Sequence, residues 1–459
     1  MIDVLVVGGG VSGLACAWAL KTAGLAVKLL EAEETPGGNL RTVQDGAWRY
    51  ELGPHSFLPS SDAIWTLIEK LQIEERVAAA ASASQARFIF KNGRLMPLPT
   101  SPWAFIATPL LSAGGKFRLL AEPFVKGGAS ERDTAREFFR RRLGDEATEW
   151  IIGPFVSGIY AGDPARLGAR DAFPKMWRWE RDAGSMIRGA RRYLKRKRIE
   201  RGARAKRKGL FSFQGGLGEL TGRLAGELGP ACQSGEGVTA VERKIGRWLV
   251  QTEAATYEAK RLVVAVPPLP AARLLAPVSA SLALALSQVE MAPVAVVHVG
   301  VTGEAAAAVP DGFGYLVPRG LGLRTLGCVF VSKLFAGRAP EGGELLTFYL
   351  GGALDPEAAR LDDAALVALA LDEFAQAVGP RLAPAYVKVL RHPQAIPQLT
   401  VGHVDRIAAL LEQARGLGAL DFAGNYLTGV GMNDAAQSGL DAAERILAAR
   451  RPKEEQTEP

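Results

Sequence analysis

Residues 4–31 read VLVVGGGVSGLACAWALKTAGLAVKLLE, a short apolar run followed by three adjacent glycines and then a helical pattern. Val4 to Val7 carry no polar alternation, as expected for a parallel strand that is buried on both faces. Ser12 to Thr22 is predicted to form a helix, and Val27 to Leu30 a second strand. The stretch therefore predicts a β–α–β unit with glycines between its first strand and its helix.

The glycines have the spacing G-x-G-x-x-G, since they stand at Gly8, Gly10 and Gly13. In this spacing the first glycine permits a tight turn, the second lets the backbone approach a pyrophosphate, and the third lets the helix pack on the strand. The start of a helix also favours an anion. Glu31 follows about 20 residues later, where a carboxylate accepts hydrogen bonds from ribose hydroxyls. We expect this turn to bind the adenosine diphosphate half of a dinucleotide; the alternative is a turn that serves packing alone.

A second glycine-rich turn, Pro36-Gly37-Gly38-Asn39-Leu40-Arg41, favours FAD over NAD. Its glycines and arginine are similar to the extended fingerprint of the glutathione-reductase-like FAD enzymes, where the arginine or nearby backbone meets the pyrophosphate. A third glycine turn, Gly429 to Asn433, precedes a predicted C-terminal helix. The N-terminus of that helix would stabilise the negative charge of a reduced flavin. The alternative is a purely structural helix.

The composition is that of an ordinary globular protein. With 459 residues and 48% hydrophobic content, the chain can bury a large core and form two or three domains. Met1 runs almost directly into the first strand, so we expect no signal or transit peptide. The longest apolar stretch, Leu262 to Leu286, is interrupted by prolines and is not expected to span a membrane. The cysteines and histidines show no metal-ligand spacing, so no metal site is predicted and a cofactor is expected to carry the chemistry.

Positive charge is concentrated between Arg188 and Lys208, in a chain whose formal net charge is +7. We interpret this segment as a loop that is either simply solvated or attracted to anionic lipid or an acidic substrate. No nucleic-acid-binding motif accompanies it, so nucleic acid is not a predicted partner. The aromatic residues between Ser101 and Trp179 also allow two interpretations, a helical core or exposed anchors in a bilayer interface.

Further motifs accompany the glycine turns at both ends of the chain. They are ELGP at 51–54, GIYAGDP at 158–164, GFGYLVP at 312–318, IPQ at 396–398 with GH at 402–403, and GVGMND at 429–434. With these motifs the chain resembles, nearly end to end, the protoporphyrinogen oxidases of the amine-oxidase-like flavoprotein superfamily. The resemblance implies an α/β plus α+β fold. It comprises a Rossmann-like FAD-binding domain of the glutathione-reductase/amine-oxidase type, discontinuous in sequence, a mixed-sheet substrate domain and a helical membrane-binding domain.

The implied domain boundaries follow the pattern of predicted elements. The FAD-binding domain comprises residues 1–79, 210–268 and 399–450, and the substrate-binding domain comprises residues 80–100, 178–209 and 269–398. The helical membrane-associated domain comprises residues 101–177, and residues 451–459 are expected to form a disordered tail.

The resemblance also implies an activity, the oxidation of protoporphyrinogen IX to protoporphyrin IX in haem biosynthesis. Six electrons would leave in three hydride transfers to flavin N5, and dioxygen would be reduced to hydrogen peroxide. The expected location is cytoplasmic, peripherally associated with the lipid surface of the cytoplasmic membrane, while contact with ferrochelatase and a homodimer stay open. The alternatives are oxidation of coproporphyrinogen III to coproporphyrin III, another amine-oxidase-like flavoenzyme, or a flavin-free lipid-binding escort protein.

By position in the resembling family, two sets of residues are expected at the site. Those expected to contact FAD are Gly8, Gly9, Gly10, Val11, Ser12, Gly13, Glu31, Gly38, Asn39, Arg41, Gly53, Pro54, His55, Ser56, Val238, His392, Gly424, Val430, Gly431 and Met432. Arg87 is expected to pair with a substrate propionate, and Phe335 and Tyr349 to enclose the macrocycle, near Gly158 and Ala161. A flat tetrapyrrole favours apolar and aromatic walls, and its propionates favour an arginine.

Overall fold

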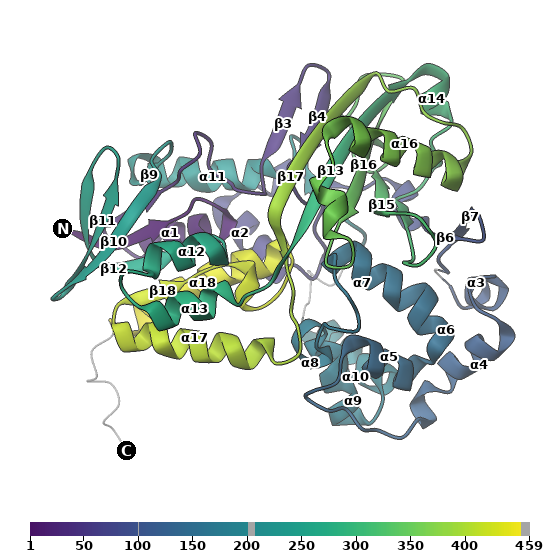
Figure 1. Ribbon diagram of the computed structural model, residues 1–459, viewed down its shortest axis with the longest axis horizontal. Coiled ribbons are helices and arrows are strands. Elements are labelled where there is room, and N and C mark those ends of the chain that lie inside the picture. Colours follow the sequence, from purple (N-terminus) through teal and green to yellow (C-terminus); the bar gives the residue numbers. More distant parts are fainter. Residues whose placement is uncertain (100, 201–206, 451–459) are drawn as a thin grey trace.

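The structure is a computed structural model that describes residues 1–99, 101–200 and 207–450. Two seven-stranded sheets, two two-stranded sheets and the helices around them make up the described part of the molecule (Figure 1). The first sheet has the order β10-β11-β12-β1-β2-β9, and β18 also pairs with β12. Its strands are β1 (Ile2–Val7), β2 (Val27–Leu30), β9 (Cys232–Gln233), β10 (Val238–Lys244), β11 (Arg247–Thr252), β12 (Thr256–Val264) and β18 (Leu420–Phe422).

The strand β1 lies inside the first sheet, parallel to both of its neighbours, β2 and β12. Val4 and Val6 pack into the core on one side, and Leu5 and Val7 pack into the core on the other. The predicted strand buried on both faces is therefore confirmed, as are the helix and second strand that follow it. The helices on the first side are α1 (Val11–Thr22), α2 (Asp62–Leu71), α11 (Gly218–Leu228) and α18 (Met432–Ala448), and those on the second are α12 (Pro268–Leu275), α13 (Ala280–Ser287) and α17 (His403–Leu417).

The first sheet is built from three separated parts of the chain, residues 2–30, 232–264 and 420–422. Residues 31–231 and 265–419 contribute the second sheet and most of the other helices before the chain returns. The domain that contains the glycine turn is thus discontinuous in sequence, as predicted.

The second sheet has the order β17-β13-β16-β15-β14-β6-β7 and mixes parallel and antiparallel pairs. A hairpin of β6 and β7 forms one edge of this sheet. One face packs on α16 (Asp363–Val378), and the hairpin of β3 (Thr42–Asp45) and β4 (Trp48–Glu51) contacts the other. The strands are β6 (Arg87–Lys91), β7 (Arg94–Pro97), β13 (Met291–Thr302), β14 (Gly314–Leu316), β15 (Thr325–Phe330), β16 (Gly343–Gly351) and β17 (Tyr386–Pro397).

The helices between residues 102 and 200 gather beside the second sheet, at the lower right of Figure 1. Their shared core contains Phe138, Phe139 and Trp177, whereas Trp103, which belongs to the same stretch, is exposed. The interpretation as a helical core is therefore confirmed for Phe138, Phe139 and Trp177. For Trp103 the bilayer interface stays a prediction. The helices are α3 (Pro102–Ala107), α4 (Ala113–Leu120), η3 (Glu122–Phe124), α5 (Ala135–Leu143), α6 (Asp145–Ala147), η4 (Thr148–Ile152), α7 (Gly153–Tyr160), α8 (Ala169–Ala172), α9 (Pro174–Ala183) and α10 (Met186–Glu200).

The structure corrects the interpretation of the basic segment 188–208 as a loop. Up to Glu200 this segment belongs to α10, while residues 201–206 lie outside the described residues, as does the predicted tail 451–459. Arginine, lysine, leucine and alanine are good helix formers, and a charge run does not prevent a helix whose start is capped. The same helix packs on α9 and η3. Residues 178–200 therefore join the helices of 101–177, rather than the second sheet.

Candidate active site

Of the three glycines of the G-x-G-x-x-G motif, packing requires Gly8 and Gly13 but not Gly10. Gly8 has a φ of +105°, and a Cβ at Gly13 would lie 2.0 Å from the carbonyl oxygen of Gly8. A Cβ at Gly10 would meet nothing within 4 Å. Gly10 is also the N-cap of α1, which has no side-chain cap and no acidic residue in its first turn. The turn thus presents bare backbone and a helix start on one side, which fits an anionic group.

Glu31 lies directly at this turn. Its Oε2 accepts a hydrogen bond from the Gly9 N–H at 2.5 Å, and its Oε1 accepts one from Glu33 N–H at 2.9 Å. The carboxylate that follows β2 is therefore held against the glycines, as the spacing predicts. The hydrogen bond to a ribose stays a prediction.

The second glycine turn folds onto the first. Gly37 N–H donates to the Gly9 carbonyl at 2.8 Å, and a Cβ at Gly38 would lie 3.2 Å from Gly10 Cα. Arg41 donates from Nε to the Gly38 carbonyl at 3.1 Å. The next expected contact, Gly53, packs against Asn39, because a Cβ there would lie 2.6 Å from the Asn39 carbonyl oxygen.

The C-terminal turn lies beside the N-terminal one. A Cβ at Gly439 in α18 would lie 2.1 Å from the Ser12 carbonyl oxygen, so α18 and α1 cross at backbone contact. Gly424 N–H donates to Ser438 Oγ at 3.0 Å, which ties the preceding loop to the same helix. Gly431 is the N-cap of α18. The structure thereby brings Met432, at the start of α18, into one core with Val11, at the start of α1. Val430 packs instead against the core of the helices at 102–200, and Val238 begins β10 of the first sheet.

His55 lies beside the second sheet. It is buried, and neither of its ring nitrogens has a hydrogen-bond partner in the described part of the chain. Its ring centre lies 6.4 Å from that of Tyr349 and 6.3 Å from that of His298. Burial, with the charges of His298 and Arg338, holds the pKa of His55 well below its ordinary value. A neutral imidazole with two unpartnered nitrogens fits a bound polar group at this point. Its neighbours Pro54 and Ser56 are half-buried.

His392 shares this character. It lies in β17 opposite Val294 of β13, and its Nε2 is buried without a hydrogen-bond partner among the described residues. Burial lowers the pKa of His392 below its ordinary value. The His392 ring is therefore neutral. It lies on the face of the second sheet that also carries Val294 and Val296.

Two of the residues expected to meet the substrate, Ala161 and Tyr349, lie on one face of the second sheet. Ala161 is buried and packs with Val294, Val296 and Tyr349 on this face. Burial raises the pKa of the Tyr349 phenol, which is therefore uncharged. Gly158 in α7 lies against β14, since a Cβ there would fall 2.3 Å from Leu316 Cδ2.

Arg87 lies at the edge of the same face. The strand register runs from Arg87 through Gly314, Val329 and Thr347 to His298, so these side chains share a face. Three strand steps of about 4.8 Å separate β6 from β16, roughly 14 Å in all. The Arg87 guanidinium lies 5.0 Å from the ring centre of Phe313 and is exposed. The second sheet thus has an apolar face with the Arg87 cation at its edge.

Phe335 lies apart from Tyr349. It is buried after the short helix α15 (Val331–Leu334), and its ring centre lies 5.9 Å from the Arg338 guanidinium carbon. The ring contacts of the described residues do not include a pair of Phe335 with Tyr349. The two rings are therefore not stacked on each other.

A buried ion pair near His55 was missed by the sequence analysis. Arg338 NH1 lies 2.9 Å from Glu51 Oε1, and both side chains are 1% exposed. Glu51 also accepts hydrogen bonds from Thr42 Oγ1 at 2.6 Å and Leu217 N–H at 3.1 Å. The pair links β4 to the segment after α15. Glu51 stands in the ELGP motif, but nothing in the local sequence indicates its partner. The sequence analysis also missed His298, whose Nδ1 shares a hydrogen bond of 2.9 Å with Thr347 Oγ1. Here too the local sequence does not indicate the partner.

The profile of the family described as flavin containing amine oxidoreductase matches residues 11–447. The chain belongs to this family. FAD is accordingly its cofactor, and the bare backbone at Gly10 and the unpartnered nitrogens of His55 fit a bound FAD. As a family member, the chain is an oxidoreductase.

Curated relatives extend the comparison over most of the chain. It is 33% identical to a chloroplastic protoporphyrinogen oxidase of Oryza sativa subsp. japonica over 97% of this chain and 88% of the relative. It is also 33% identical to protoporphyrinogen oxidase 1 of Arabidopsis thaliana, over 96% of this chain and 87% of the relative.

Solved structures share the fold. A crystal structure from Exiguobacterium sp. 255-15 matches with a TM-score of 0.82 and 24% identity, covering 98% of this chain and 99% of that chain. Cyclohexylamine oxidase of Brevibacterium oxydans IH-35A matches with a TM-score of 0.73 and 17% identity, covering 98% and 100%.

Proposed function

We propose that this protein oxidises protoporphyrinogen IX to protoporphyrin IX with FAD as cofactor and dioxygen as terminal acceptor. The substrate loses six electrons and six protons, and three dioxygen molecules become three hydrogen peroxide molecules. The observation that carries the proposal is the 33% identity to protoporphyrinogen oxidases over 97% of the chain. It is supported by a glycine turn whose bare backbone at Gly10 suits a dinucleotide.

The proposed roles follow the geometry. FAD, when bound, supplies the electron-accepting chemistry. The glycine turns and Glu31 bind it, and the neutral rings of His55 and His392 face it without adding charge. The apolar face that carries Tyr349 and Ala161 holds the macrocycle and excludes water. Arg87 at its edge pairs with a propionate.

Catalysis in this proposal rests on positioning. Removing electrons and pyrrole protons from a held macrocycle requires no strong side-chain base, so alignment supplies most of the acceleration. Phe335 is proposed to wall the far side of the substrate, and Gly158 to let α7 approach β14 closely.

Coproporphyrinogen III is the second candidate substrate, because the coproporphyrinogen III oxidase of Bacillus subtilis (strain 168) is 28% identical over 97% of both chains. Its additional propionates would suit the same arginine-edged face. The two substrates differ in side chains rather than in the ring that is oxidised, so the same mechanism serves both.

The test is an anaerobic assay with both porphyrinogens. Protoporphyrinogen IX should bleach the bound flavin, and porphyrin fluorescence should appear and peroxide accumulate when air is admitted. Equal or faster turnover of coproporphyrinogen III would reverse the choice of substrate. Purified protein that is colourless and takes up no added FAD would remove the oxidase proposal and favour an escort protein.

We also propose that the enzyme is cytoplasmic and attaches peripherally to the cytoplasmic membrane through its helices at residues 102–124. Trp103, Phe117 and Phe124 are 80%, 75% and 84% exposed there, and Ile106 and Leu120 are each 61% exposed. Clustered exposed aromatic and aliphatic side chains suit a bilayer interface. Among the described helices, none combines the length and apolar character needed to span a bilayer. Detergent-free protein that fails to float with any liposome would contradict this attachment.

A further inference from the structure

The basic helix α10 has no part in the proposed chemistry, yet four of its cations lie along one side. Arg188, Arg191, Arg192 and Lys195 are spaced three, four and seven residues from the first and are all exposed. Residues with this spacing lie along one face of a helix. No ion pair joins any of the four to another residue that the structure describes. The helix thus presents a stripe of four cations to solvent.

Packing fixes the rotation of α10, so the stripe cannot turn inward. A Cβ at Gly189 would lie 2.3 Å from Trp179 Cβ, which brings α10 and α9 into backbone-close contact. The Tyr193 ring lies 5.6 Å from the Trp179 ring on the same side. Gly189 and Tyr193 point toward α9 and the four cations point away, because the two groups occupy different faces of the helix.

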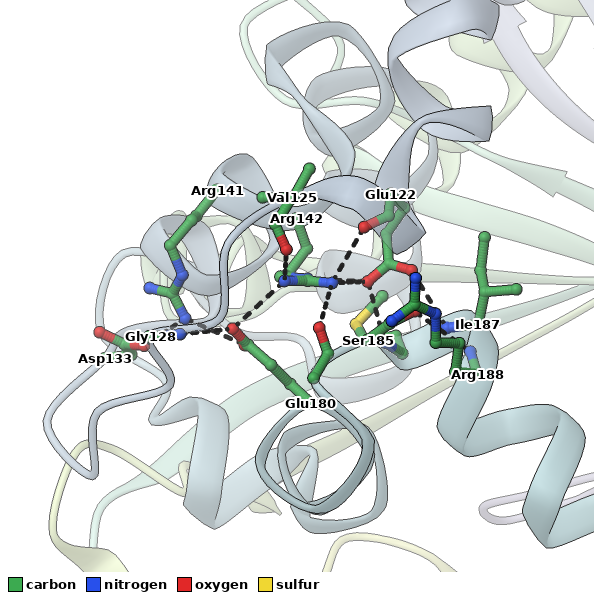
Figure 2. A network of polar contacts seen from close by, with 12 residues as sticks. Glu122, Val125, Gly128, Asp133, Arg141, Arg142, Glu180, Ser185, Ile187 and Arg188 are labelled. Carbon is green, nitrogen blue, oxygen red and sulfur yellow. Dashed lines mark hydrogen bonds and ion pairs between the residues drawn. The ribbon is translucent and has the colours of Figure 1, made fainter.

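A buried polar network anchors the start of α10 (Figure 2). Glu122 accepts hydrogen bonds from Ser185 Oγ at 2.5 Å, from Met186 N–H at 2.9 Å and from Ile187 N–H at 3.2 Å. Arg142 holds this carboxylate through Nε at 2.7 Å and is fully buried. The first free N–H groups of α10 are therefore satisfied by a residue from another part of the chain.

The same residue connects the basic stripe to the exposed apolar side chains. Glu122 begins η3, which ends at Phe124, whose side chain is 84% exposed. α4 directly precedes η3 and carries Phe117 and Leu120, which are also exposed. Cations beside exposed aromatic side chains are the combination by which helices bind the surface of an anionic bilayer.

We propose that the basic stripe of α10 binds anionic phospholipid headgroups, so that membrane attachment of this protein requires anionic lipid. The inference rests on the membrane attachment proposed above. A nucleic acid or a soluble acidic protein would use the cations but would leave the exposed Phe124 and Phe117, on elements that adjoin the start of α10 through η3, without a partner. An anionic bilayer uses both, because its headgroups meet the cations and its interface accepts the aromatic rings.

The experiment compares flotation with phosphatidylcholine vesicles and with vesicles of equal parts phosphatidylcholine and phosphatidylglycerol, using the FAD-loaded protein. The test variant replaces Arg188, Arg191, Arg192 and Lys195 by glutamine. The matched control replaces four exposed basic residues of the other domains, Lys70, Arg223, Arg273 and Lys388, by glutamine. A third variant, Arg188→Lys with Arg191→Lys and Arg192→Lys, keeps the charge of the stripe.

The wild-type protein should bind the anionic vesicles at least tenfold more tightly than the neutral ones, with a preference that weakens as salt is raised. The glutamine variant of α10 should lose at least tenfold on anionic vesicles alone, while the control and the lysine variant behave as wild type. Flavin absorbance and turnover in detergent should be equal in all four proteins.

Equal binding of the glutamine variant and wild type to anionic vesicles would overturn the inference while leaving the membrane attachment intact. So would a wild-type protein that does not distinguish the two vesicles. Failure to bind either vesicle would overturn both. Binding of soluble polyglutamate that depends on the stripe, without binding of anionic vesicles, would assign the surface to an acidic protein instead.

Discussion

Alanine substitutions at Gly13 and at Gly10 should have different consequences, although both glycines belong to the same turn. At Gly13 the new Cβ would lie 2.0 Å from the Gly8 carbonyl oxygen and 3.2 Å from Ala265 Cβ. At Gly10 it would meet no protein atom within 4 Å. Gly13→Ala therefore perturbs the folded protein itself, whereas Gly10→Ala perturbs the space that FAD is proposed to fill.

The magnitude at Gly13 follows from that contact. Real Cβ atoms essentially never come closer than 3.0 Å to such a neighbour, so the backbone of β1 or α1 must move by about 1 Å, at a typical overpacking cost of about 3 kcal/mol. Alanine regains about 1 kcal/mol of helix propensity. The free energy of unfolding should therefore fall by about 2 kcal/mol. At Gly10 the loss is at most that of an N-cap residue, about 1 kcal/mol.

The assay measures both quantities on each variant. Urea unfolding of the apoprotein gives the free energy of unfolding, and flavin fluorescence gives the Kd for FAD. Gly10→Ala should weaken FAD binding at least tenfold, which is about 1.4 kcal/mol, while its apoprotein stays within about 1 kcal/mol of wild type. Gly13→Ala should destabilise the apoprotein more than Gly10→Ala does.

Two results would refute the reasoning. If Gly10→Ala binds FAD with the wild-type Kd, the cofactor does not approach the backbone at Gly10. If the Gly13→Ala apoprotein is as stable as wild type, α1 and β1 are not held in the close contact from which the cost is derived.

Other predictions concern the substrate edge, the buried network and the histidines. Arg87→Ala should lower kcat/KM, with a loss of transition-state stabilisation of about 1.5–3 kcal/mol, the contribution of a hydrogen bond to a charged group. An unchanged kcat/KM would remove the propionate role. Arg142→Ala leaves Glu122 buried without its cation and should lower the free energy of unfolding by about 3–5 kcal/mol in urea; a loss below about 1 kcal/mol would contradict burial of the pair. Burial lowers the pKa of His298 to about 3 and that of His55 well below its ordinary 6.5. Because the unfolded chain then binds more protons, this contribution to stability is fully present well above pH 6.5 and is lost as pH falls below it. For His298 alone the loss at pH 5.5 is about 1.4 kcal/mol. Urea titrations well above pH 6.5 and at pH 5.5 should show that the free energy of unfolding falls less for His298→Asn than for wild type. An equal fall in the two proteins would contradict a buried, neutral His298.

Local sequence patterns predicted the structure correctly wherever that structure depends on residues close together in the sequence. The valine run, the glycines of 8–13 and the strand at 27–30 form a β–α–β unit because hydrophobic periodicity and steric limits act within a few residues. The terminal turn at 429–433 was predicted for the same reason. The motifs scattered along the chain also predicted the family and its cofactor.

The basic segment 188–208 marks the opposite case, because its local sequence is compatible with both a loop and a helix. The carboxylate of Glu122, held by Arg142, accepts the first N–H groups of α10, and Trp179 receives its packed face. None of these partners is encoded in the segment itself.

The sequence by itself therefore determined the dinucleotide turn, the secondary structure around it and the family of the protein. The tertiary structure alone decided that α10 is a helix with its cations outward, that His55 stands beside Tyr349, and that Glu51 pairs with Arg338. The physical reason is that capping, burial and ion pairing depend on which distant residues come into contact, and a local pattern carries no record of its distant partners.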